Sequence, residues 1–165
     1  MSEGIVMGWS EFAVASAGAA GALAGLLIVA ISVNIKEIIA EAVLPVRAGA
    51  TVASVVAIMI GSLLVLLPAQ PAVALGLELL AVTLFCGAFQ LQAARALLRH
   101  GEHGPRGSLS AKVALTVGQL VPLLLGALLV CVGQSAGMYW VAGGFLLMFV
   151  VAILNAWVLM VEILR

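Results

Sequence analysis

The residues best suited to chemistry are a few polar side chains inside long apolar segments. Glu78 is the ionisable side chain placed deepest, about six residues into its segment and so about 9 Å deep at 1.5 Å per residue. A charge inside a membrane costs at least a few kcal/mol, and no Lys or Arg stands at that depth in any segment. The carboxyl must be protonated, hydrogen-bonded, hydrated or matched by a cation. Two interpretations stay open: a proton or cation site, or a neutral carboxyl bonded to a neighbouring helix.

Further polar side chains extend a possible path for ions or protons. Glu11 opens the first segment, where the helix dipole alone would favour a carboxylate. Around an axis shared between copies, Glu11 would instead form an acidic ring that attracts cations. Asn and Gln inside such segments usually bridge helices, but they would also line a hydrated path. Besides Glu78 and Glu11, the candidates for this path are Gln92, Asn34, Gln119 and Asn155.

The spacing of Glu78 and Gln92 places both on one face of the predicted helix. At 100° per residue, Glu78, Phe89 and Gln92 fall within about 40° of one another on one helix face. If these side chains line a hydrated path, the path would run along that face. If they form interhelical hydrogen bonds, the face would instead pack against neighbouring helices.

Constellations for catalysis or metal binding are missing from the sequence. The chain has no Asp, which excludes an Asp-based triad, a kinase-type magnesium site and an EF-hand loop. Cys86 and Cys131 stand alone in apolar segments, without a CxxC pair. His100 and His103 flank Glu102, but the spacing fits no standard four-ligand zinc site and favours a solvated connection. We expect no enzymatic activity, no metal and no cofactor.

The composition indicates an integral membrane protein. Of the 165 residues, 65% are hydrophobic and 8% are charged, whereas a soluble domain is about 25% charged. This excludes a soluble globule, a disordered chain and a nucleic-acid binder. A transmembrane helix needs about 20 apolar residues. Five segments meet this length: 12–33, 48–67, 72–91, 113–132 and 138–159.

These segments predict one all-α domain over residues 1–165. We expect a bundle of five transmembrane helices, with a lead helix followed by two tight helical hairpins. The third helix should continue to residue 98 and the fifth to residue 164. The first helix has no stop before Pro45, so the stretch 36–47 can extend it.

The distribution of charge predicts how the bundle is oriented. Five spans place all seven Lys and Arg on one face, which the positive-inside rule makes cytoplasmic. The protein is then N-out and C-in in a bacterial inner membrane, with cytoplasmic connections 34–47 and 99–112. The N-terminus has no basic region, so we expect no cleaved signal peptide. A protein partner would meet the cytoplasmic face at Arg95, Arg99, Arg106 and Lys112.

The first segment also carries a stripe of small residues. Ala13, Ala17, Gly21 and Gly25 recur every four positions and share one helix face. Small residues let helix backbones approach closely in lipid. The stripe predicts either packing against this chain's own helices or contact between copies in a homo-oligomer.

The first segment has the pattern F…AGA…AL.GLL.VA.S.N, from Phe12 to Asn34. In this pattern, over roughly its first 45 residues, the chain resembles small uncharacterised multi-span proteins of high-GC bacteria. Some of these are labelled as modulators of a membrane protease, and no catalytic residue comes with the resemblance. The size and span number are also similar to the tryptophan-rich sensory protein family, but the Trp-Pro-rich motifs of that family are absent.

Two functions are compatible with these features. The first, slightly favoured by Glu78 and the small-residue helix, is a homo-oligomeric channel or carrier for protons or cations. The alternative is a non-catalytic membrane interaction, assembly or regulatory protein that docks a partner through its basic cytoplasmic connections. A water-filled path from Glu78 to Gln92 would favour the first. A packed bundle with a basic face would favour the second.

Overall fold

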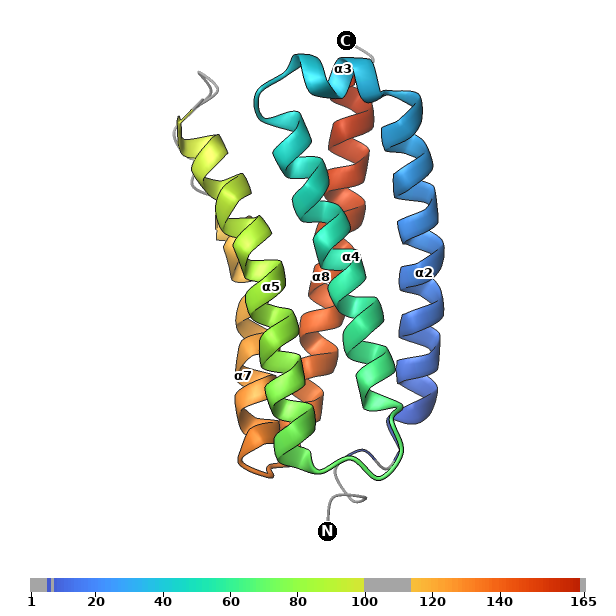
Figure 1. The fold of residues 1–165 in the computed structure, drawn as a ribbon, viewed down its shortest axis with the longest axis vertical. Coiled ribbons are helices and arrows are strands. Elements are labelled where there is room, and N and C mark those ends of the chain that lie inside the picture. Colours follow the sequence, from blue (N-terminus) through green and yellow to red (C-terminus); the bar gives the residue numbers. More distant parts are fainter. Residues whose placement is uncertain (1–5, 7, 100–113, 164–165) are drawn as a thin grey trace.

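The computed structural model of the chain is an all-α bundle (Figure 1). It describes residues 6, 8–99 and 114–163, without the side chains of residues 158–163. Five stretches of this part are long and apolar enough to cross a membrane, which confirms the predicted fold class. The helices are α2 (Ser10–Val33), α3 (Ile35–Ala40), α4 (Leu44–Val65), α5 (Ala72–Arg99), α7 (Leu120–Cys131) and α8 (Ala136–Ile163), and residues 114–118 form a further helical stretch before α7.

The two predicted hairpins are α4–α5 and α7–α8, which are joined by residues 66–71 and 132–135. The second turn shows how the sequence stops a helix. Gly133 has a φ of 77°, a left-handed conformation that suits glycine. Its N–H donates to the Val130 carbonyl at 2.9 Å, and the Gln134 N–H donates to the Leu129 carbonyl at 2.9 Å. This is a Schellman motif, which satisfies carbonyls at the end of α7.

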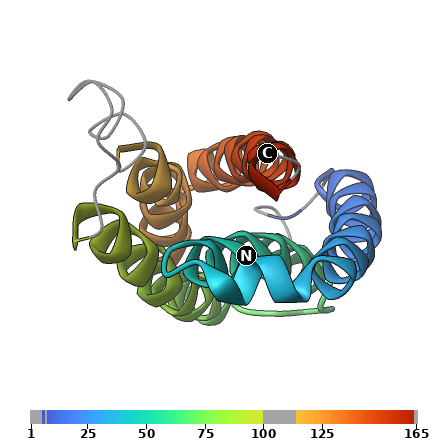
Figure 2. The same cartoon turned by 90° about the horizontal axis from the view of Figure 1, so that it is seen from above.

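Helix α4 is central, and α2 lies at the edge of the bundle (Figure 2). Helix α4 packs against α2, α5 and α8, whereas α2 packs mainly against α4. Small buried residues such as Ala50, Ser54 and Ala57 let the neighbours of α4 approach closely. At Gly61, an added Cβ would lie 2.6 Å from the ring of Phe145 on α8, so the space between these helices is full.

Short helix α3 lies across one end of the bundle (Figures 1 and 2). The predicted extension of the first helix towards Pro45 is therefore wrong. The chain turns at Asn34, and Pro45 instead lies in the first turn of α4. Proline is tolerated there because the first N–H groups of a helix have no partner within that helix.

The described charged residues lie towards the two ends of the bundle: Glu11 and Glu78 at one end, and four cations together with the exposed Glu37 and Glu41 at the other. Lys36, Arg47, Arg95 and Arg99 lie at the end capped by α3, hereafter the basic end. Helix α2 begins at the opposite end, and α8 ends at the basic end, as an odd number of spans requires (Figure 1).

Candidate functional site

Glu78 lies half-buried near the start of α5, at the opposite end from the basic residues. Its Oε2 accepts a hydrogen bond from Nε2 of Gln70, in the turn that joins α4 to α5. The Oε1 atom of Gln70 is buried and has no hydrogen-bond partner among the described residues. In this chain the Glu78 carboxyl therefore ties the α4–α5 turn to the first turns of α5, which is the structural interpretation of this residue.

This contact predicts different costs for two substitutions. Glu78→Gln keeps an acceptor for the Gln70 amide and is expected to change the free energy of unfolding by less than about 0.5 kcal/mol. Glu78→Ala leaves the Gln70 amide without a partner and is expected to cost about 1–3 kcal/mol. Denaturant unfolding in detergent micelles measures both values, and Leu77→Ala at an exposed neighbouring position is the control. Equal destabilisation by Gln and Ala would show that the negative charge itself is required.

The helix face between Glu78 and Gln92 is apolar. Gln92 lies fourteen residues further along α5, which is about 21 Å, and its side chain is exposed. Between them the same face carries Val82, Phe85 and Phe89. The rings of the two phenylalanines meet edge to face, with centroids 5.2 Å apart. Among the described residues, this face provides no polar relay from one end to the other.

Three further path candidates lie apart from one another. Glu11 is exposed in the first turn of α2. Asn34 caps the end of α2, where its Nδ2 donates to the Ala30 carbonyl at 2.9 Å. Gln119 is buried before α7, and its Nε2 donates to the Thr116 carbonyl at 3.0 Å. The amides of Asn34 and Gln119 thus bond to the backbone of their own helical stretches.

The small-residue stripe of α2 is split between two environments. Ala13 is buried and Ala17 half-buried, but Gly21 and Gly25 are exposed. An added Cβ at either glycine would meet no described atom within 4 Å. The side chains of α2 that are buried are Ala13, Ser16, Ala20 and Leu27. The second half of the stripe therefore faces away from this chain's own helices.

One polar cluster in the interior bridges α4 and α5. Gln90 Nε2 donates to the Ala50 carbonyl at 3.0 Å and to Ser54 Oγ at 2.6 Å. Ser54 Oγ also donates to the Ala50 carbonyl at 3.1 Å and lies 3.9 Å from Cys86 Sγ. All these side chains are buried. Gln90 is thus an interhelical bridge, the common role of glutamine in a membrane helix.

The cationic side chains at the basic end differ in how exposed they are. Lys36 on α3 and Arg95 and Arg99 on α5 are exposed, whereas Arg47 is half-buried. The remaining predicted residues of this face and its two histidines lie outside the described residues: Arg106, Lys112, His100 and His103. Within the described ranges, no group of three or more His, Cys, Asp or Glu could hold a metal ion.

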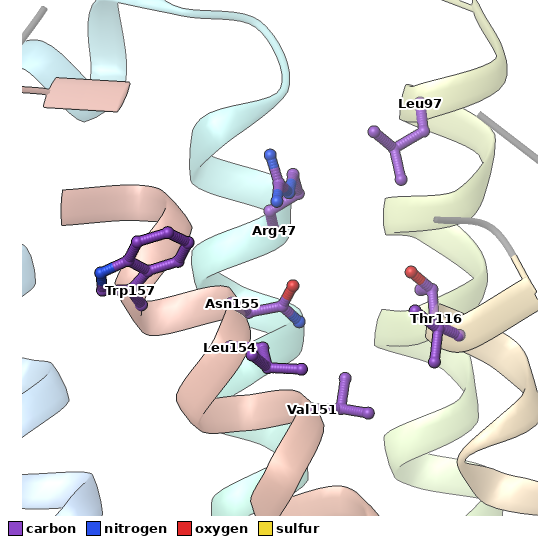
Figure 3. Close-up of a pocket in the computed structure, with 8 residues that line it drawn as sticks. Arg47, Leu97, Thr116, Val151, Leu154, Asn155 and Trp157 are labelled. Atoms are coloured by element: carbon purple, nitrogen blue, oxygen red, sulfur yellow. The ribbon is translucent and has the colours of Figure 1, made fainter. Parts of the chain in front are cut away.

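Arg47 and Asn155 line a cavity of about 250 Å³ at the basic end (Figure 3). Its walls come from α4, α5, residues 114–118 and α8. Figure 3 shows Arg47 and Asn155 on one side of this space and Leu97 and Thr116 on the other. Sequence reasoning missed this site. Arg47 was assigned to a connection, and a single threonine at position 116 gives no signal of its own.

No protein-family model, curated protein or solved structure matches this chain. Any functional conclusion therefore rests on the residues themselves. In the described part, Glu78, Asn34 and Gln119 make local hydrogen bonds, although the buried Oε1 of Gln119 has no partner there, and the polar side chains do not form one continuous route. Among the described residues, the basic end combines exposed cations with a cavity that holds polar side chains.

Proposed function

We propose that this protein is a non-catalytic interaction protein of a bacterial inner membrane, which docks an acidic segment of a partner at its basic end. The observation that carries the proposal is the excess of cations at this end, where the described residues include four cations and two carboxylates, Glu37 and Glu41. Lys36, Arg95 and Arg99 are exposed there. Under the positive-inside rule the basic end is cytoplasmic, where a soluble or membrane partner can reach it.

The packing of the bundle supports docking over transport through one chain. Large side chains such as Ile58, Phe145 and Met148 are fully buried between α4 and α8. Interiors packed in this way leave few voids larger than a water molecule. The exposed arginines would act by electrostatic complementarity, which favours encounter with an acidic partner and disfavours a basic one.

Photo-crosslinking in intact cells tests the docking proposal. A photoreactive residue at exposed Leu98, beside Arg95 and Arg99, should form an adduct with a partner protein. Reversing both arginine charges (Arg95→Glu, Arg99→Glu) should lower its yield roughly 2- to 30-fold, because each lost pair is worth about 0.2–1 kcal/mol.

Position 132 is the matched control for this experiment. Val132 is similarly exposed but lies at the end of the bundle opposite Leu98. It should not form the same adduct. An adduct at position 98 that charge reversal leaves unchanged, or an equal adduct at position 132, would contradict docking at the basic end.

A homo-oligomeric channel for protons or cations is the second candidate. One observation favours it: Glu11, Gly18 and Gly25 are exposed and fall within about 40° on one face of α2. Copies of the chain that packed through this face would bring several carboxylates to one mouth, where an acidic ring attracts cations. In that case the path would run between copies and not through the packed interior.

A further inference from the structure

A second hollow, an apolar groove, lies along one side of α4 near the basic end. Helices α2 and α5 both pack against α4, and each contributes to the walls, Ile31 from α2 and Phe85 and Phe89 from α5. The volume of the groove is about 430 Å³, and its described lining contains no polar side chain. The groove shares no described lining residue with the cavity around Arg47 and is therefore a separate site.

The floor of the groove consists of small residues of α4. Ala48, Gly49 and Ala53 line it, and a Cβ added at Gly49 would meet no described atom within 4 Å. On α4 the lining extends from Pro45 to Val56, about 16 Å along a helix that is apolar enough to cross a membrane. Side chains around an unfilled space lose their dispersion contacts. We therefore expect this groove to be filled at the depth of the hydrocarbon.

Helix α3 covers the groove at the basic end. Ile35, Ile38 and Ile39 line the groove, and at 100° per residue they share one face of α3. Lys36 and Glu37 are exposed and fall outside that face. Figures 1 and 2 show α3 lying across this end of the bundle. An occupant would thus enter from the side, where the bilayer lies, and not along the helix axis.

The cover and the apolar lining together identify the occupant. A transmembrane helix of a partner or of a second copy is about 10–12 Å wide with its side chains, and one running parallel to α4 would meet α3. An extended peptide would bring N–H and C=O groups into the groove, and the lining has no polar side chain to satisfy them. An acyl chain is narrow and flexible and has no group that needs a hydrogen bond.

We propose that this groove binds one acyl chain of a phospholipid from the leaflet at the basic end, with the headgroup at the membrane surface beside α3. The chain comes from an apolar bilayer and not from water, so the binding depends on packing contacts. The exposed charges of α3 and the residue that ends it are Lys36, Glu37 and Glu41. Because these charges have mixed signs, we expect the charge of the headgroup to contribute little.

Native mass spectrometry tests this proposal, because the mass of a complex identifies the occupant. The protein is purified in detergent micelles, stripped of lipid and titrated with phosphatidylglycerol or phosphatidylethanolamine. We expect one phospholipid to bind each chain at a lower concentration than any further lipid. The two lipids should reach half-occupancy at concentrations within about fivefold of each other, because exposed charge pairs contribute little.

Variants of the floor distinguish the groove from the rest of the lipid-facing surface. Gly49→Leu should raise the concentration for half-occupancy roughly 5- to 150-fold, because the leucine side chain would take the place of the acyl chain. Val52→Phe fills the same groove and is the second variant if Gly49→Leu does not fold. Gly21→Leu is the matched control, since an added Cβ there also meets no described atom within 4 Å but the residue is outside the described lining. It should leave the value unchanged.

Three results would overturn the proposal. The first is a concentration for half-occupancy that Gly49→Leu and Val52→Phe both leave unchanged, because the lipid would then bind elsewhere. The second is protein that retains a free fatty acid or a second copy of the chain and takes up no phospholipid. The third is binding of phosphatidylglycerol more than about fivefold tighter than that of phosphatidylethanolamine, which would assign the affinity to the headgroup and not to the chain.

Discussion

Replacing Gly126 by Leu is expected to destabilise the bundle by about 3 kcal/mol, since overpacking a full interior costs typically 1–3 kcal/mol and occasionally more. Helices α7 and α8 meet through glycines. A Cβ on Gly126 would lie 2.6 Å from the backbone N of Val141 and 2.9 Å from the carbonyl O of Gly137. Backbone atoms cannot swing aside as a flexible side chain can, so the two helices would have to separate.

Gly21→Leu is the matched control for this substitution. Gly21 also lies within a membrane-spanning helix, but an added Cβ there would meet no described atom within 4 Å. The free energy of unfolding should therefore change by less than about 0.5 kcal/mol. Denaturant unfolding in detergent micelles, followed by helical circular dichroism, gives both values. If Gly21→Leu destabilised the bundle as much as Gly126→Leu, the assignment of α2 to the edge would be contradicted.

The sequence was sufficient to predict the five helices and the two hairpins. A membrane span has a length that the bilayer fixes, and backbone groups in lipid must bond within a helix. The predicted segment 72–91, with its continuation to residue 98, corresponds to α5, Ala72–Arg99. The positions at which the helices end were harder to predict, because polar residues are found both within helices and in the turns that follow them. Asn34 ends α2, although Pro45 was the first residue expected to stop that helix.

The arrangement of the helices could not be predicted from the residues alone. Helices α2 and α4 are both rich in small residues, but those of α4 are buried and Gly21 and Gly25 of α2 are exposed. Small residues permit close packing without specifying the neighbour. The position of a helix depends on all the other helices together. The stripe on α2 therefore identified a helix face that can pack closely, but it did not identify the helix that packs against it.

The candidate site was predicted only in part, for a similar reason. Glu78 stood out because a carboxylate is rare in a membrane segment, yet its partner is Gln70, in a turn. Arg47 did not stand out, because it was assigned to a connection and a basic residue is ordinary there. Its place in a cavity with Asn155 depends on the packing of α4 against α8, which no spacing in the sequence encodes.

Flux across vesicles tests most directly whether this protein acts by contact or by transport. Purified protein is reconstituted into phosphatidylcholine–phosphatidylglycerol vesicles that enclose a pH-sensitive dye, and a proton or potassium gradient is imposed. The docking proposal predicts that flux equals that of protein-free vesicles for the wild type, and that an added ionophore discharges the gradient in both. A protein-dependent flux that Glu78→Gln or Glu11→Gln lowers would contradict it and would favour the homo-oligomeric channel.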